Sequence, residues 1–169
     1  NAKDSDSDAL DRAEELFKEI LEEEPNHATA RAYYGIIYTI KARRSYLPWL
    51  KMKYVEKGFQ ELDRSVYLDS ENPISRYLRG VAGVKVPKFF NRLNTAEKDF
   101  NYLKQKEIYQ TLDENTKLKI AYYSGLIFKE RGKNMEALEL FEKALRVTND
   151  KTFVKDVQKS IADLKKQIG

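Results

Sequence analysis

The sequence predicts an all-α protein, and three observations support that prediction. Apolar residues recur every three or four positions along most of the 169-residue chain, as they do on one face of an α-helix. Only 7 Gly and 4 Pro are present, which is few for an all-β chain with its many turns. No segment carries a strand signal.

Eight helices joined by short turns are expected, and Pro or Gly marks many of their ends. The expected helices cover residues 9–24, 28–44, 47–68, 73–86, 94–109, 114–131, 134–147 and 151–168. Pro25 stops the first helix, Pro87 stops the fourth, and Gly132 stops the sixth. Pro48 and Pro73 fit the first turn of the third and fourth helices, where a missing N–H costs nothing.

Three of these helices have distinctive patterns. In the fifth, Asn94 and Glu97 have the spacing of a capping box, with Asn94 as the N-cap. The third helix carries an apolar stripe of Trp49, Met52, Val55, Phe59, Leu62 and Val66. The last helix carries a stripe of Val154, Val157, Ile161, Leu164 and Ile168, which predicts that it covers the open face of the helices before it.

Three of the six intervals between mid-helix glycines and small residues of neighbouring helices have a regular spacing, and the other three are longer. Ala13 and Gly35 are 22 residues apart, and so are Gly58 and Gly80. Gly125 and Ala137 are 12 residues apart. A glycine inside a helix costs about 1 kcal/mol relative to alanine. We therefore expect these glycines to lie where paired helices approach closely, with a small residue opposite.

Several segments together resemble the tetratricopeptide repeat family, a 34-residue helix–turn–helix unit. They are YYGIIY (33–38), YLRG (77–80) and YYSGLIFKERGKNMEALELFEKAL (122–145), with EEEPNH and LDSENP as turns between repeats. The pattern is similar to bacterial-type members with insertions in the turns within repeats. Gly83 is a departure, because a large aromatic residue is usual there.

The resemblance implies a right-handed α–α superhelix, a solenoid of about three and a half helix pairs over residues 9–148. Residues 1–8 are expected to form a flexible acidic lead-in or a cloning remnant. Residues 149–169 are expected to form a C-terminal capping helix. Such repeats act as scaffolds for protein binding.

The composition excludes many enzyme classes. The chain has no Cys and one His, His27, so it lacks the residues for disulfides, zinc–thiolate sites and catalytic triads. No glycine-rich phosphate loop occurs. We therefore expect no enzyme, no metal and no cofactor. No apolar run reaches the roughly 20 residues of a membrane span. A soluble protein is expected, either cytoplasmic or exported after removal of a leader.

The first helix of each pair lines a concave groove in the resembled family, and a protein or peptide partner binds there. By resemblance, the groove residues are Ile36, Thr39, Ile74, Tyr77, Val81, Val84, Lys119, Tyr122, Leu126 and Lys129, with Thr29 and Ala32 at its start. A mostly apolar groove suits an amphipathic helix or an extended peptide. Alternatively, a segment of the chain itself fills the groove, such as the 109–116 loop.

Charge points to a second docking surface. The net charge is +4, but residues 1–27 carry −7 while residues 41–57 and 76–92 each carry +5. Both basic segments fall at expected insertions, because the interval from Gly35 to Gly58 (23 residues) and that from Gly80 to Ala96 (16 residues) exceed the regular interval of 12 residues by 11 and by 4. They would form a basic–aromatic edge of Arg43, Arg44, Trp49, Lys51, Lys53, Lys85, Lys88, Phe89 and Arg92, together with Tyr46 and Phe90.

An acidic protein, RNA or an anionic membrane surface would each fit this edge. A simpler interpretation is that Trp49, Phe89 and Phe90 pack the two insertions together while the charges are merely solvated. A third possibility is a homo-oligomer formed through the N-terminal end, where the first helix lacks a partner.

Overall fold

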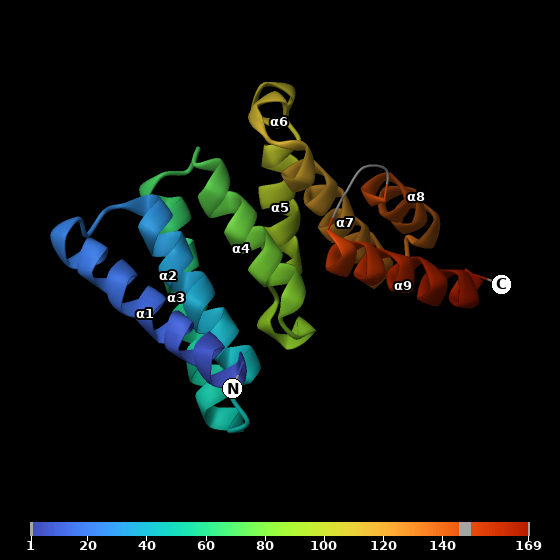
Figure 1. Ribbon diagram of the computed structural model, residues 1–169. Coiled ribbons are helices and arrows are strands. Elements are labelled where there is room, and N and C mark those ends of the chain that lie inside the picture. Colours follow the sequence, from blue (N-terminus) through green and yellow to red (C-terminus); the bar gives the residue numbers. More distant parts are fainter. Residues whose placement is uncertain (1, 146–149, 169) are drawn as a thin grey trace. The chain divides into compact units, whose positions relative to one another are not determined.

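The computed structural model describes residues 2–145 and 150–168, with side chains described from Asp8 onward. Over these residues the chain is all-α, with nine α-helices and antiparallel contacts between neighbouring helices (Figure 1). The helices are α1 (Ala2–Glu23), α2 (Ala28–Arg44), α3 (Pro48–Leu68), α4 (Pro73–Lys85), α5 (Leu93–Leu103), α6 (Lys106–Thr111), α7 (Glu114–Glu130), α8 (Asn134–Ala144) and α9 (Lys151–Ile168). A short 3-10 helix, η1 (Lys88–Phe90), precedes α5.

The chain divides into two compact units, residues 1–82 and 83–169, and the boundary falls within α4. In unit 1, α2 and α3 form an antiparallel hairpin, and α1 packs along α2 (Figure 1). In unit 2, α7 and α8 form a second hairpin, with α5 against α7 and α9 against α8.

The hairpin of unit 1 is built on the close approach of two glycines. A Cβ on Gly35 would lie 2.8 Å from the carbonyl oxygen of Gly58, and a Cβ on Gly58 would lie 3.0 Å from the carbonyl oxygen of Gly35. Phe59 and Leu62 are fully buried beside this crossing. The expectation of a close helix–helix contact at Gly35 is therefore confirmed.

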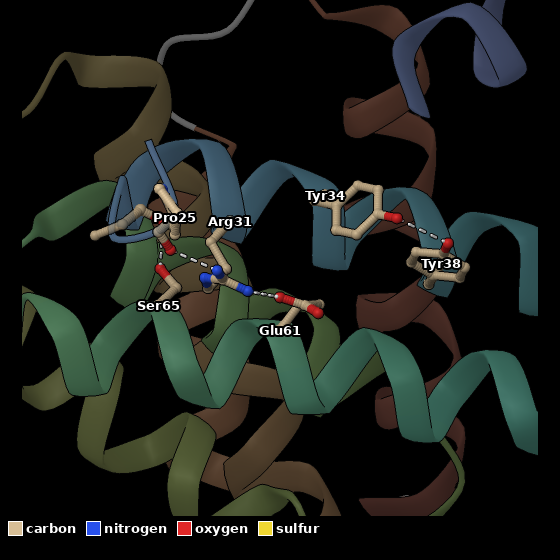
Figure 2. A network of polar contacts seen from close by, with 7 residues as sticks. Pro25, Arg31, Tyr34, Tyr38, Glu61 and Ser65 are labelled. Carbon is tan, nitrogen blue, oxygen red and sulfur yellow. Dashed lines mark hydrogen bonds and ion pairs between the residues drawn. The ribbon is translucent and has the colours of Figure 1, made fainter. Parts of the chain in front are cut away.

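Polar contacts hold together the end of the same hairpin where α2 begins and α3 ends (Figure 2). Arg31 of α2 binds the carboxylate of Glu61 on α3 and the carbonyl oxygen of Pro25. The hydroxyls of Ser65 and Ser75, both fully buried, lie 2.6 Å apart, and Ser65 also donates to the carbonyl oxygen of Ala28 at 2.8 Å. These contacts join the start of α2 to α3 and α4, and those of Ser65 and Ser75 satisfy hydroxyl groups that water cannot reach.

Unit 2 repeats the glycine contact in α7 and α8. A Cβ on Gly125 would lie 2.7 Å from the Phe141 ring and 3.3 Å from the carbonyl oxygen of Ala137. This confirms the expected pairing of Gly125 with Ala137. Between α4 and α5, however, the contact falls at Gly83, whose Cβ would lie 3.1 Å from that of Ala96. Gly83, which departs from the repeat pattern in the sequence, thus takes part in the close approach of α4 and α5.

The start of α5 also differs from the sequence-based expectation. Its N-cap position is Arg92, with no side-chain cap, so Asn94 and Glu97 do not form a capping box. Instead, both side chains bind Arg131 at the end of α7. The guanidinium donates to the two carboxylate oxygens of Glu97 at 2.7 Å each and to Asn94 Oδ1 at 3.0 Å. A bidentate ion pair satisfies these acceptors more strongly than backbone N–H groups would.

Other helix boundaries differ as well. The first helix begins at Ala2 instead of near residue 9, so the expected lead-in of residues 1–8 is helical where the structure describes it. The expected helix 94–109 is two helices, since α5 ends at Leu103 and α6 begins at Lys106. Helix α8 ends at Ala144. The expected domain boundary at 148–149 lies outside the described residues.

Candidate docking surface at the α2–α3 turn

Helix α9 covers part of the groove expected in unit 2. The ring of Tyr122 meets Phe153 of α9 edge-on, with centroids 5.4 Å apart, and its hydroxyl lies 3.3 Å from Ser160 Oγ. Leu126 packs on the same buried cluster, which includes Val157 and Leu164 of α9. Lys119 forms an ion pair at 3.9 Å with Asp150, just before α9. The chain's own helix α9 therefore covers these expected groove residues, whereas the sequence had suggested the 109–116 loop.

Burial is also visible in the tyrosines next to α9. Removal from water raises the pKa of Tyr122, and it raises the pKa of Tyr123 to about 12. Val84 and Lys129, the remaining expected groove residues of this unit, are half-buried.

The groove positions of unit 1 do not all line an open surface. Ala32 is fully buried, and Thr39 packs against α3, with its methyl 2.9 Å from the position of a Cβ on Gly58. The Thr39 hydroxyl donates to the carbonyl oxygen of Ile36 in its own helix. Ile74 is 41% exposed. The other positions are half-buried: Thr29, Ile36, Tyr77 and Val81.

The unit 2 part of the expected basic edge is largely engaged within its own unit. Lys88 forms an ion pair with Glu130, and Lys85 Nζ lies 5.4 Å from the centre of the Tyr123 ring. Arg92 is half-buried. The rings of Phe89 and Phe90 are in tilted contact, with centroids 4.5 Å apart, and Phe89 remains 66% exposed. Lys85 and Lys88 are nevertheless exposed, Lys88 over 72% of its side chain, so this segment still presents some basic surface beside Phe89.

The unit 1 part of the edge is open and lies at the α2–α3 turn. Tyr46 is 95% exposed and Trp49 is 70% exposed. Leu47 and Met52 beside them are exposed as well. Arg43, Lys51 and Lys53 are exposed basic residues in the same segment. We call these seven residues the turn surface.

The sequence folds this way for local reasons. The backbone N–H of Ser45 donates to the carbonyl oxygens of Lys41 and Ala42, which closes the last turn of α2. The Ser45 hydroxyl accepts from the N–H of Leu47 at 3.3 Å. Pro48 then starts α3 with a backbone angle suited to the first helical position. Tyr46 and Leu47 are thereby held in an ordered turn between two helices.

Lys41 and Arg44 flank the turn surface, and Lys41 is occupied by acidic residues of α1. Lys41 binds Glu14 and Asp11 of α1, the latter at 2.9 Å. Burial alone would raise the pKa of the Glu14 carboxyl, but the hydrogen bonds from Lys41 and Tyr38 outweigh it and lower the pKa. Tyr38 also bonds the hydroxyl of Tyr34, as Figure 2 shows. Arg44 is exposed and also takes part in an interaction.

Sequence reasoning missed Leu47 and Met52 as surface residues. Met52 shares the three-to-four periodicity of the α3 stripe, but burial on that stripe begins only at Val55. One feature of the sequence does indicate that both residues are exposed. They lie inside a basic segment without acidic residues, since no Asp or Glu occurs between Glu24 and Glu56.

Within residues 8–145 and 150–168, no group of three or more His, Asp or Glu side chains could hold a metal ion. Nor is any helix there long and apolar enough to cross a membrane. The fold and the site together define an all-α helical-hairpin protein with an exposed basic–aromatic turn. No protein-family model, curated protein or solved structure matches the chain.

Proposed function

We propose that the protein is a non-enzymatic docking module that contacts an acidic partner through the turn surface. The observation that carries the proposal is the exposure of Tyr46 and Trp49 in a segment whose exposed charges are all basic. Aromatic and aliphatic side chains gathered at one exposed turn mark an interaction site more strongly than scattered ones. The exposed cations would attract a negatively charged partner.

The scaffold that presents this surface would be a tetratricopeptide-like solenoid. In each of two helix pairs, α2–α3 and α7–α8, a mid-helix glycine of the first helix lies against the second helix. Gly35 lies against Gly58, and Gly125 lies against Ala137 and Phe141. In unit 2, α9 lies against the last pair, as a capping helix would. Both features support the repeat reading, in which the turn within the first complete pair carries the docking residues.

A cross-linking experiment tests the docking function without assuming the partner. The chain has no Cys, so Tyr46→Cys provides a single site for a photo-cross-linker. Tyr67→Cys is the matched control, because Tyr67 is 77% exposed near the other end of α3. In an extract of the source cells with its membranes, we expect adducts from position 46 and few from position 67. Equal labelling from both positions would refute docking through the turn.

Peptide binding in a groove is a second candidate, limited to the positions of unit 1. The exposure of Ile74 on α4 favours it. An apolar peptide should remain bound between about 0.1 M and about 0.5 M salt, since screening weakens only charged contacts. It should be lost in Tyr77→Glu. Binding that vanishes at high salt and ignores Tyr77→Glu would exclude this candidate.

Self-association through the N-terminal end remains a further proposal. Leu16 and Ile20 are exposed one helical turn apart on α1, so a second copy could cover them. Sedimentation equilibrium of the chain and of Leu16→Glu measures this directly. A monomer at all concentrations would exclude it.

A further inference from the structure

We propose that the turn surface docks on an anionic lipid bilayer, with the rings of Tyr46 and Trp49 in the interfacial layer and the basic side chains at the lipid phosphates. This inference rests on the docking function proposed above and names the chemical class of the partner. It follows from the position of the turn, from its apolar side chains and from its charge.

The turn projects beyond the packed part of the hairpin. Ala42 is the last buried residue of α2, and Val55 is the first buried residue of α3. All residues from 43 to 54 are exposed or half-buried. The α2–α3 connection therefore forms an end of the hairpin that is not part of the core (Figure 1). A projecting end can meet a flat surface, whereas a peptide is usually held in a concave one.

The apolar side chains favour a bilayer over a nucleic acid. Trp and Tyr are enriched at membrane interfaces, because their rings are apolar and their N–H or O–H groups stay hydrated. Leu47 and Met52 are exposed beside them. Aliphatic side chains gain from contact with acyl chains but provide no ring on which a base could stack. All four side chains would thus contribute on a membrane, and only two on RNA.

The charge of the turn surface complements anionic headgroups. Arg43, Lys51 and Lys53 are exposed, and the nearest acidic residue along the chain is Glu56. Lys41 makes no contribution, because Asp11 and Glu14 neutralise it. Each basic residue near an anionic membrane surface strengthens binding about fivefold, and salt screens this gain. Three such residues together with the inserted side chains provide the two signals that stable peripheral binding requires.

The local structure lowers the cost of docking. Ser45 and Pro48 hold the turn in a fixed conformation, so little further ordering is needed when it meets a surface.

Trp49 is itself the probe for the test, because it is the only Trp of the chain. The full chain is mixed with vesicles of phosphatidylcholine alone or with about one-third phosphatidylserine, the anionic lipid that sets the surface potential. Sedimentation measures binding, and Trp49 emission measures the environment of the turn. We expect binding to the anionic vesicles, a blue shift of Trp49 emission, and quenching by bromine on the lipid acyl chains.

A pair of charge reversals locates the contact. Lys51→Glu combined with Lys53→Glu should weaken binding to the anionic vesicles at least about 25-fold, from about fivefold for each lost basic residue. Lys155→Glu combined with Lys159→Glu on α9 makes the same change in net charge at exposed positions of unit 2. That control should bind as the unmodified chain does. Equal losses in both pairs would overturn the assignment of the turn.

Two further outcomes separate this inference from the docking function. Suppose that single-stranded RNA or a polyglutamate peptide changes Trp49 emission while anionic vesicles do not. The bilayer is then the wrong partner, but docking through the turn stands. If vesicles, RNA and polyglutamate all leave Trp49 emission unchanged and Tyr46→Cys forms no adducts, both proposals fail. Vesicle binding without a change in Trp49 emission would overturn insertion of the turn.

Discussion

Replacing Gly35 by alanine should destabilise unit 1, although alanine is the better helix former. A Cβ at this position would lie 2.8 Å from the carbonyl oxygen of Gly58, 2.9 Å from Leu62 Cγ and 3.1 Å from the backbone N of Leu62. Carbon atoms in contact normally lie about 3.5–4.0 Å apart. Two of these neighbours are backbone atoms of α3, so no side-chain rotation can make room. The two helices must move apart instead.

The expected magnitude follows from two opposing terms. Overpacking in a well-packed region costs about 1–3 kcal/mol, and the rigid backbone opposite places Gly35→Ala at the upper end. Helix propensity returns about 1 kcal/mol. We therefore expect the free energy of unfolding to fall by about 2 kcal/mol in urea denaturation followed by far-ultraviolet circular dichroism. A variant as stable as the unmodified chain, or more stable, would refute the close-approach argument.

Two other glycines serve as comparisons. Gly125→Ala would meet mainly the ring of Phe141, which can shift more easily than backbone, so its loss should be smaller than that of Gly35→Ala. Gly132 has a φ of +73° and open space around it, so alanine there should cost only about 1 kcal/mol of backbone strain. Similar losses in the free energy of unfolding at all three positions would mean that contact with the Gly58 carbonyl oxygen does not explain the effect of Gly35→Ala.

Three other changes have expected outcomes. Because the pKa of Glu14 is lowered, its ionised carboxylate stabilises the fold above the usual pKa of 4.5, and this contribution is lost as pH falls through the folded-state pKa. Glu14→Gln should therefore make stability less dependent on pH in the acid range, as measured by circular dichroism at a series of pH values. Arg131→Ala should lower the free energy of unfolding by about 1 kcal/mol in urea titrations, and Arg131→Lys should restore only part of it, because lysine cannot bind Glu97 through two nitrogens. Leu164→Ala should cost about 3 kcal/mol in thermal unfolding, since Leu164 is fully buried, and a cost below about 1 kcal/mol would contradict its place in the core of unit 2.

Much of the helical framework could be predicted from the sequence, because several helix ends are marked by residue type. Pro48 and Pro73 open α3 and α4 as expected. The break between α5 and α6 was missed because Lys104 and Gln105 are not helix-breaking residues. The spacing of Asn94 and Glu97 satisfied a local rule, but a guanidinium more than thirty residues away binds both side chains.

The candidate site was only partly predictable for a related reason. Periodicity assigned Trp49, Met52 and Val55 to one face of α3, and the structure does place them in one helix. Periodicity could not indicate that burial on α2 ends at Ala42. Of the three side chains, only that of Val55 is therefore buried. Likewise, Tyr122 belongs to the expected groove by its position in α7, but α9 packs over it. Both outcomes depend on where a neighbouring helix ends or lies.

The contact of Arg131 with α5 has a consequence for the order of folding. Helix α5 has eleven residues and no side-chain cap, and isolated helices of that length are marginal in water. Arg131 stands at the C-terminal end of α7, so the first turn of α5 gains its anchor only after α7 has docked. The α7–α8 hairpin would then form first and act as the template on which α5 becomes helical. Amide protons of α5 should therefore exchange with solvent no more slowly than those of α7.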